Sequence, residues 1–164
     1  MGEGYDYKCK TCKMKYSVRL GIGFGFPSVY RQLLSDIRNG KYGDTFKNTL
    51  ELKKYVAVDA EKELYICKNC GKWETSYILN LYVPKNIEEL LNKQYGIKTV
   101  REWGYVPYVM RYDLINNYKL LRRYVHICSN CGKRTHKATE ADLGQLSCPN
   151  CSTKNAIESY VDWD

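Results

Sequence analysis

The sequence lacks the apolar segments that direct a protein into or across a membrane. It contains no run of about 20 apolar residues, so it predicts no membrane-spanning helix. The first ten residues, MGEGYDYKCK, contain no apolar core of the kind found in a secretory signal. The hydrophobic fraction of 44% and charged fraction of 27% are typical of a globular chain rather than a disordered one. We therefore expect a cytoplasmic protein without a membrane partner, folded as one domain or two small ones.

Residues suited to catalysis are also scarce. There are only two histidines, His126 and His136, and the sequence contains no H-E-x-x-H, G-x-x-x-x-G-K-[ST] or G-x-S-x-G motif. A zinc deaminase needs H-x-E and P-C-x-x-C, but neither histidine is followed by that glutamate and Pro149 lies inside its C-x-x-C. A compact nuclease-like centre of both histidines with Asn130 is the remaining alternative. We expect no catalytic residues, no small-molecule substrate and a protein that is not an enzyme.

No cysteine lies outside a C-x-x-C pair. The eight cysteines are Cys9, Cys12, Cys67, Cys70, Cys128, Cys131, Cys148 and Cys151. This strict pairing, without an export signal, argues against a disulfide framework. Two thiolates on one tight turn can face the same metal ion, and two such turns complete a tetrahedral shell with Zn–S distances of about 2.3 Å. The sequence therefore predicts two structural Zn²⁺ ions. Rubredoxin-type iron needs the same geometry and remains open, whereas a thioredoxin-like redox pair would need a βαβ setting.

The spacing of the pairs indicates how they divide between the two sites. Cys131 and Cys148 are separated by 16 residues, which fits a C-x2-C-x16-C-x2-C zinc motif. One site is therefore predicted to contain Cys128, Cys131, Cys148 and Cys151. By elimination the other contains Cys9, Cys12, Cys67 and Cys70, across 54 intervening residues. Such a long loop adds a modest closure cost, because that entropy grows logarithmically with length. A crossed pairing of the four turns is the alternative.

Two of the pairs resemble the knuckles of the zinc-ribbon superfamily, the type also found in rubredoxin. They are Cys67-Lys-Asn-Cys70-Gly71-Lys72 and Cys128-Ser-Asn-Cys131-Gly132-Lys133, in which the glycine permits the positive φ of the turn. The other two pairs have Lys13 and Ser152 in place of this glycine. The whole chain also resembles small bacterial zinc-ribbon proteins of unassigned function, through GIGFGFP at 21–27 and the paired knuckles. The resemblance implies ribbons of short antiparallel strands and transfers no catalytic residue.

We expect an α+β fold of two zinc-ribbon modules, with a helical insertion in the first. The predicted ranges are 1–85 for the N-terminal module with its insertion at about 28–54, 86–97 for a linking helix, and 98–164 for the C-terminal module with its basic aromatic stretch. Within the insertion, an apolar face at Val29, Leu33, Leu34 and Ile37 predicts a helix over 29–38, and a second is expected over 45–54.

Three further segments have patterns that can be interpreted. Alternating residues predict a strand over 73–83, and Asn86 with Glu89 forms the capping box of a helix over 87–95. Residues 111–121 fit a helix or a strand equally well. The glycines at 21–25 are spaced G-x-G-x-G rather than G-x-G-x-x-G, so we expect a packed turn with Phe24 and Phe26 in the core instead of a nucleotide loop.

The net charge of +8 would fall to about +4 once eight thiolates bind two Zn²⁺ ions. Residues 101–138 hold eight Lys and Arg against two acids, whereas 139–164 hold one against five. Cations that neutralise phosphates beside rings that stack on bases are typical of single-stranded nucleic-acid binding. The candidate contact residues are Arg101, Arg111, Lys119, Arg122, Arg123, Lys133, Arg134, Lys137, Trp103, Tyr112 and Tyr124, and a second basic cluster comprises Lys8, Lys10, Lys13 and Lys15.

Nucleic acid and protein are both open as partners. We predict a non-catalytic zinc-ribbon protein that contacts nucleic acid through the basic and aromatic surface. The alternative is a protein–protein adaptor, or an inhibitor acting on a partner enzyme or complex. In that case the lysines balance the negative charge of the thiolate centres, and the 16 tyrosines serve as core and rim residues.

Overall fold

The computed structural model describes residues 2–163, which form two compact units. The first, here called the cysteine unit, comprises 2–24, 61–77 and 125–163 of the described chain, and the second, the helical unit, comprises 25–60 and 78–124. The division differs from the predicted ranges 1–85, 86–97 and 98–164, because distant segments pair in one sheet and the chain passes between the units four times. Among the described residues no helix combines the length and apolar character that a bilayer span requires.

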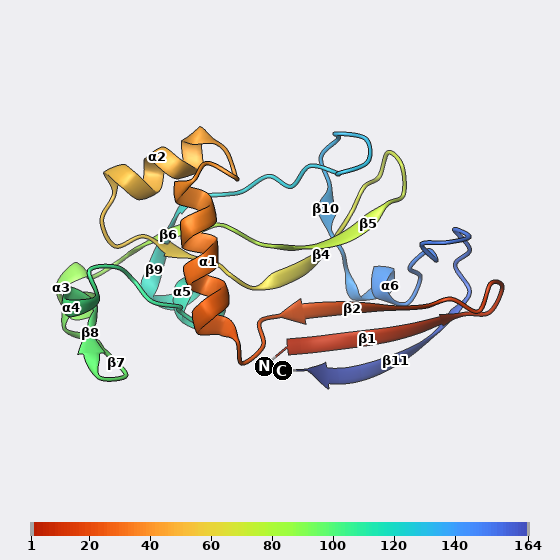
Figure 1. The fold of residues 1–164 in the computed structure, drawn as a ribbon, viewed down its shortest axis with the longest axis horizontal. Coiled ribbons are helices and arrows are strands. Elements are labelled where there is room, and N and C mark those ends of the chain that lie inside the picture. The colour runs from red at the N-terminus through yellow and green to blue at the C-terminus, as the bar shows by residue number, and fades with distance from the viewer. Residues whose placement is uncertain (1, 164) are drawn as a thin grey trace. The chain divides into compact units, whose positions relative to one another are not determined.

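A mixed α+β architecture with antiparallel sheets is confirmed. The cysteine unit contains one antiparallel sheet with the order β10-β4-β2-β1-β11, in which β5 also pairs with β4. Its elements are β1 (Gly2–Cys9), β2 (Lys15–Gly21), β4 (Lys62–Ile66), β5 (Trp73–Tyr77), β10 (His136–Lys137), α6 (Glu140–Leu143) and β11 (Ala156–Trp163). Strand β1 lies between β2 and β11, as Figure 1 shows. The first and last strands of the described chain are therefore neighbours.

Two stacked tyrosines form the centre of the cysteine unit. The rings of Tyr7 and Tyr16 lie 5.0 Å apart with 7° between their planes, and both side chains are buried. Their hydroxyls donate hydrogen bonds to the carbonyl oxygens of Leu143 at 2.9 Å and Leu146 at 3.3 Å. Buried tyrosines normally satisfy their hydroxyls in this way. The two bonds attach the segment before Cys148 to the sheet, and this places the last C-x-x-C pair.

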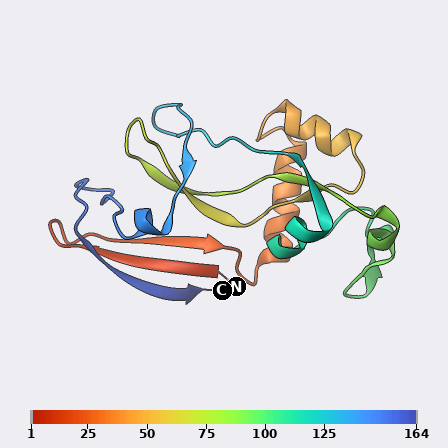
Figure 2. The ribbon, with the colours of Figure 1, turned by 180° about the vertical axis from the view of Figure 1, so that it is seen from behind.

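The helical unit combines two longer helices with a small sheet (Figures 1 and 2). Its sheet has the order β3-β6-β9, and β7 and β8 form a separate hairpin. The elements are α1 (Phe26–Arg38), α2 (Asp44–Leu52), β3 (Ala57–Val58), β6 (Leu81–Pro84), α3 (Ile87–Asn92), β7 (Gln94–Tyr95), β8 (Lys98–Thr99), α4 (Val100–Trp103), α5 (Arg111–Asn117) and β9 (Tyr118–Arg122).

The helices predicted at 29–38 and 45–54 are confirmed as α1 and α2. Helix α1 buries Leu33, Leu34 and Ile37, as its apolar periodicity indicates. The two helices nevertheless belong with 78–124 in the helical unit rather than inserting into an N-terminal ribbon. The segment left open at 111–121 contains both structures, because α5 ends where β9 begins.

Two predicted elements need correction. The strand expected over 73–83 is two strands, β5 and β6, in different sheets. Between them Leu79 is buried with a left-handed φ of 61° and donates its N–H to the Asp59 carbonyl, which breaks the extended run. The helix expected over 87–95 is capped by Asn86 but ends at Asn92, because β7 begins at Gln94 and turns back onto β8.

The two phenylalanines expected in the core are on the surface. Phe24 is 70% exposed and Phe26 is 36% exposed. Helix α1 begins directly after Gly25, with Pro27 in its first turn, so Phe26 lies at the helix end and contacts the ring of Tyr108 at 4.9 Å. The GIGFGFP segment thus serves as the entry to a helix, a role consistent with proline at the first positions of a helix.

Candidate metal centres

All four C-x-x-C pairs form the same backbone turn. In each, the N–H of the first cysteine donates to the carbonyl five residues later at 2.8–2.9 Å, and the N–H four residues later donates back at 2.8–3.1 Å. The residue at that fourth position has a left-handed φ: 64° at Lys13, 72° at Gly71, 69° at Gly132 and 61° at Ser152. The knuckle geometry predicted from two of the pairs therefore extends to the two that lack glycine.

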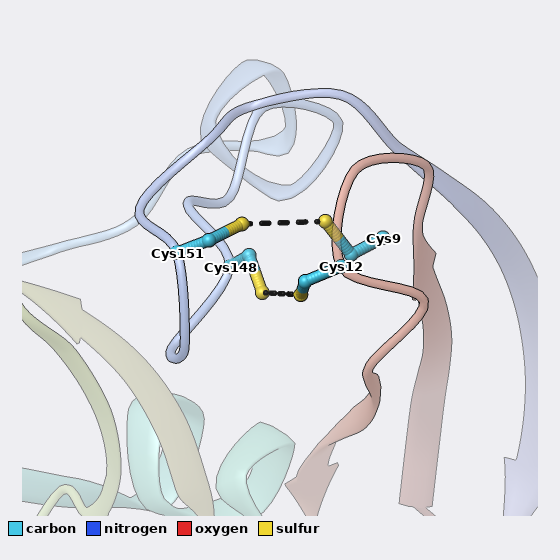
Figure 3. A group of neighbouring side chains, drawn as sticks. All are labelled: Cys9, Cys12, Cys148 and Cys151. Atoms are coloured by element: carbon cyan, nitrogen blue, oxygen red, sulfur yellow. Dashed lines mark hydrogen bonds between the residues drawn. The ribbon is translucent and has the colours of Figure 1, made fainter.

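The first and last pairs form one cluster, which we call the outer cluster. It contains Cys9 and Cys12 from the turn between β1 and β2, and Cys148 and Cys151 from the turn before β11, with all four Sγ atoms within 4.8 Å of one another. Cys9 Sγ lies 3.6 Å from Cys151 Sγ, and Cys12 Sγ lies 3.5 Å from Cys148 Sγ. Figure 3 shows the four sulfurs directed toward a common centre.

The second and third pairs form the inner cluster. It contains Cys67 and Cys70 from the turn between β4 and β5, and Cys128 and Cys131 from the loop before β10, again within 4.8 Å. The closest sulfur pairs are Cys67 with Cys131 at 3.4 Å and Cys70 with Cys128 at 3.6 Å. These are the two groups of potential metal ligands found in residues 2–163, and neither includes a histidine. The alternative centre of His126, His136 and Asn130 therefore has no support as a metal site in the described chain.

The geometry of both clusters fits a tetrahedral metal ion. All eight cysteines are free, and their sulfurs lie well beyond the disulfide length of about 2.05 Å. Four sulfurs placed about 2.3 Å from a central ion lie about 3.8 Å from one another. The observed closest separations of 3.4–3.6 Å and the upper limit of 4.8 Å bracket this value. Each cluster can therefore hold one metal ion.

The division of the pairs between the clusters is a correction of the prediction. The expected sites were Cys9, Cys12, Cys67 and Cys70 in one group and Cys128, Cys131, Cys148 and Cys151 in the other. The structure instead joins the first pair to the fourth and the second to the third, which is the crossed alternative.

Strand pairing is the physical reason for this division. Strand β11 lies antiparallel to β1 with Ala156 opposite Cys9, so the fourth turn arrives beside the first. In the same way, β10 pairs with β4 through His136 opposite Ile66, which brings the third turn to the second. The short spacer between Cys131 and Cys148 contains β10 and α6, and these lead the chain from one cluster to the other.

Hydrogen bonds lower the thiol pKa of Cys9 and Cys12 in the outer cluster and of Cys70 in the inner cluster, which favours their thiolate forms. Thr153 Oγ1 lies 3.4 Å from Cys9 Sγ, and its hydrogen bond, with the backbone N–H of Cys12, lowers the pKa of the Cys9 thiol to about 6. In the inner cluster, the backbone N–H of Lys72 is the main cause that lowers the pKa of the Cys70 thiol to about 6. The thiolate is the form that binds metal.

A hydrogen-bond bridge joins the two knuckles of the inner cluster. Ser129 lies between Cys128 and Cys131, and it donates from its backbone N–H at 3.1 Å and from Oγ at 2.6 Å to the carboxylate of Glu74. Lys72 Nζ donates to Ser129 Oγ at 2.7 Å. Sequence reasoning missed Glu74 and Ser129, because the contact spans 55 residues and no local spacing indicates it.

The residues predicted to contact nucleic acid divide between the two units. The helical unit contains Arg101, Trp103, Arg111, Tyr112, Lys119, Arg122, Arg123 and Tyr124, and the cysteine unit contains Lys133, Arg134 and Lys137.

Acidic partners and aromatic packing occupy five of these residues. Arg101 lies 3.7 Å from Glu88, Arg111 lies 3.9 Å from the buried Asp59, and Lys137 lies 2.6 Å from Glu63. The ring of Tyr124 packs edge-on against that of Phe46 at 5.2 Å. The ring of Trp103 lies 5.9 Å from that of Tyr105, and Lys98 Nζ lies over it, 5.5 Å from the ring centroid. These five side chains are therefore partly committed to contacts within their own unit.

The three cations on and after β9 differ from these residues, because they have no acidic partner among the residues that the structure describes. Lys119, Arg122 and Arg123 are exposed, and none has an ion pair with any residue of the described chain. Strand β9 is the outer strand of its sheet, and Tyr112 in the preceding helix is 76% exposed.

The distribution of charge also differs between the units. The helical unit contains 14 Lys and Arg against eight Asp and Glu, which is a formal charge of +6. The described residues of the cysteine unit contain 12 against nine, so their formal charge is +3 before any metal binds. Divalent ions in the two thiolate clusters would lower this by about two charges each. The positive charge of the protein therefore belongs mainly to the helical unit.

Comparison with known proteins gives no match. No protein family, curated protein or solved structure is significantly similar to this chain. The two cysteine clusters and the charged surface are therefore the observations from which a function can be argued.

Proposed function

We propose that this is a non-catalytic nucleic-acid-binding protein held together by two structural zinc ions. Four thiolates in a tetrahedral arrangement are a donor set that suits zinc, and a shell of four protein ligands leaves no position for a substrate or a reactive water. Zinc in the outer and inner clusters would make each a zinc-ribbon centre, with hairpin knuckles from distant segments. Iron takes the same geometry, so elemental analysis of the protein from its native source decides between the two metals.

The observation that carries the proposal is the group of exposed cations without acidic partners on and after β9. Lys119, Arg122 and Arg123 make no ion pair in the described chain, and they belong to the unit with a formal charge of +6. Cations of this kind bind phosphates and release condensed counterions from the nucleic acid. The exposed ring of Tyr112 offers a face on which an unpaired base can stack.

The test is the salt dependence of binding to single-stranded oligonucleotides, measured by fluorescence anisotropy on the metal-loaded chain. Each phosphate contact contributes a slope of about −0.7 in log K against log salt, so Arg122→Ala with Arg123→Ala should reduce the slope by about 1.4. The matched control is Arg31→Ala with Lys47→Ala, which removes two cations from α1 and α2 and should leave affinity and slope near those of the parent. No binding at low salt, or equal losses in both variants, would contradict the proposal.

A second function is favoured by the outer strand of the cysteine unit. Strand β11 is eight residues long and lies at the edge of its sheet, with Ile157 59% exposed and Tyr160 56% exposed. An exposed edge of this length can accept an extended segment of a partner protein. In that case the protein would act as an adaptor, or as an inhibitor of a partner enzyme or complex. A single stoichiometric protein retained after nuclease treatment in a pull-down, and lost from an Ile157→Lys variant, would favour this function over nucleic-acid binding.

A further inference from the structure

The helical unit contains a basic pocket that is separate from the exposed cations on and after β9. A cavity of about 120 Å³ lies at the C-terminal ends of α1 and α2, beside the segment that follows α4. Three cations line it, Arg38 from α1 and Lys53 and Lys54 from the segment after α2. Residues from three separate parts of the unit thus converge on one cavity.

The cations of this pocket exceed the negative charge that surrounds them. Arg38, Lys53 and Lys54 are exposed, and their side chains have no ion pair or hydrogen bond with the described chain. Glu51 is the one acid among the lining residues. Each of the two helix C-termini contributes a further charge of about −0.5. Three cations against about −2 leave a surplus of about one positive charge, which an anion would balance.

Two tyrosines, Tyr55 and Tyr105, are also among the residues that line the pocket. Tyr55 has a left-handed φ of 58°, a conformation that is costly for a side chain of this size. It packs against the core around Ala57 and Leu91, while its neighbours Lys53 and Lys54 line the cavity. Tyr105 lines the cavity from the segment after α4.

We propose that this pocket binds a phosphate group. An arginine can donate two parallel hydrogen bonds to phosphate oxygens, and a lysine adds a mobile point charge. If the bound phosphate belongs to a nucleic-acid strand, the inference rests on the proposed function. The phosphate chemistry is common to the free ion, a mononucleotide and a strand, and the experiment separates these sources.

The experiment is a titration of the zinc-loaded, ¹⁵N-labelled chain followed by its amide NMR signals. Inorganic phosphate, a nucleoside 5′-monophosphate, the same nucleoside without phosphate and a short single-stranded oligonucleotide are added separately. We expect the amides of residues 53–56 and 104–106 to shift with the three phosphate-bearing probes and not with the nucleoside. Arg38→Ala with Lys53→Ala should lower the affinity obtained from these shifts about tenfold or more. Arg31→Ala with Lys47→Ala should leave that affinity unchanged. Unchanged amide signals in β6 and α5, which belong to the helical unit but do not line the pocket, show that each variant remains folded.

The outcomes separate this inference from the proposed function. If phosphate shifts no amides of the pocket, or shifts them equally in both variants, the pocket is not a phosphate site, even where the oligonucleotide binds through β9. If phosphate and mononucleotide bind the pocket while the oligonucleotide neither shifts these amides nor binds elsewhere, the proposed function fails and the phosphate site stands. If the oligonucleotide binds with full affinity to the Arg38/Lys53 variant, a strand phosphate in the pocket is contradicted.

Discussion

Replacing Ser152 with glycine should stabilise the outer cluster, because this residue holds a backbone conformation that suits glycine. Its φ is 61°, in the knuckle position where the inner cluster has Gly71 at 72° and Gly132 at 69°. A left-handed conformation costs a residue with a Cβ atom about 1–2 kcal/mol. Glycine avoids this cost but loses about 0.5–1 kcal/mol more conformational entropy on folding. The expected net gain in the free energy of unfolding is about 0.5–1 kcal/mol.

Lys13 occupies the same position in the first knuckle, with a φ of 64°. Here the side chain contributes a contact of its own, because Nζ donates a hydrogen bond to the Lys10 carbonyl at 2.7 Å. A hydrogen bond of this kind contributes about 0.5–1.5 kcal/mol, and less at an exposed site. We therefore expect Lys13→Gly to stabilise the protein less than Ser152→Gly.

The two knuckles of the inner cluster have glycine at this position, so the opposite substitution, from glycine to alanine, can be made there. A Cβ atom built on Gly71 or Gly132 meets no other atom within 4 Å, so a change to alanine alters the backbone cost and little else. Gly71→Ala and Gly132→Ala should each lower the free energy of unfolding by about 1 kcal/mol.

Urea denaturation measures these differences in the free energy of unfolding. The free zinc concentration must be buffered, because metal release is coupled to unfolding. With a slope of about 2 kcal/mol per molar urea, a gain of about 1 kcal/mol raises the midpoint by about 0.5 M. A lower midpoint for Ser152→Gly, or unchanged midpoints for both alanine variants, would refute the argument that the left-handed turn is a strained and shared feature of the four knuckles.

Three further predictions concern the cysteine unit. Removing metal with a chelator should unfold this unit, because structural zinc sites contribute about 10–16 kcal/mol of apparent binding energy, and circular dichroism unchanged by chelation would contradict a structural role. Glu74→Gln should increase metal loss from the inner cluster about tenfold in a competition assay with a chromogenic chelator, because the carboxylate accepts both hydrogen bonds from Ser129, whereas Glu158→Gln should have no effect. The N–H and hydroxyl of Thr139 lower the pKa of Asp142 below its ordinary value of 3.8, so this capping box stabilises the folded state above that pH and is lost as the pH falls through the lowered pKa. Asp142→Asn should therefore lower the melting temperature of the zinc-loaded protein at pH 7, whereas Glu140→Gln, at the same helix end but without a hydrogen bond to Thr139, should lower it less. Equal losses in the two variants would contradict this.

Local features of the fold could be predicted because short-range physics determines them. Helix α1 follows from the spacing of Leu33, Leu34 and Ile37, which places one apolar face on a helix. Helix α3 begins directly after Asn86, because that side chain caps the helix by accepting the Glu89 N–H. The C-x-x-C turns are local in the same sense, since their hydrogen bonds span four or five residues.

The features that could not be predicted depend on contacts between distant segments. The position of Ala156 opposite Cys9 brings the fourth turn to the first, and nothing near Cys148 in the sequence indicates this. The spacing of the last two C-x-x-C pairs predicts that they share one site, but the pairing of β11 with β1 places the fourth pair beside the first. The alternation over 73–83 likewise gives no sign of the turn at Leu79, whose conformation depends on its hydrogen bond to Asp59.

Cadmium-113 NMR tests the pairing of the cysteine turns most directly. Substitution of both sites with ¹¹³Cd allows correlation of each metal signal with the Hβ protons of the cysteines that bind it, in the unmutated chain. One cadmium signal should correlate with Cys9, Cys12, Cys148 and Cys151, and the other with Cys67, Cys70, Cys128 and Cys131. A cadmium ion that correlates with Cys128 and Cys148 together, or fewer than two bound cadmium ions, would contradict the account.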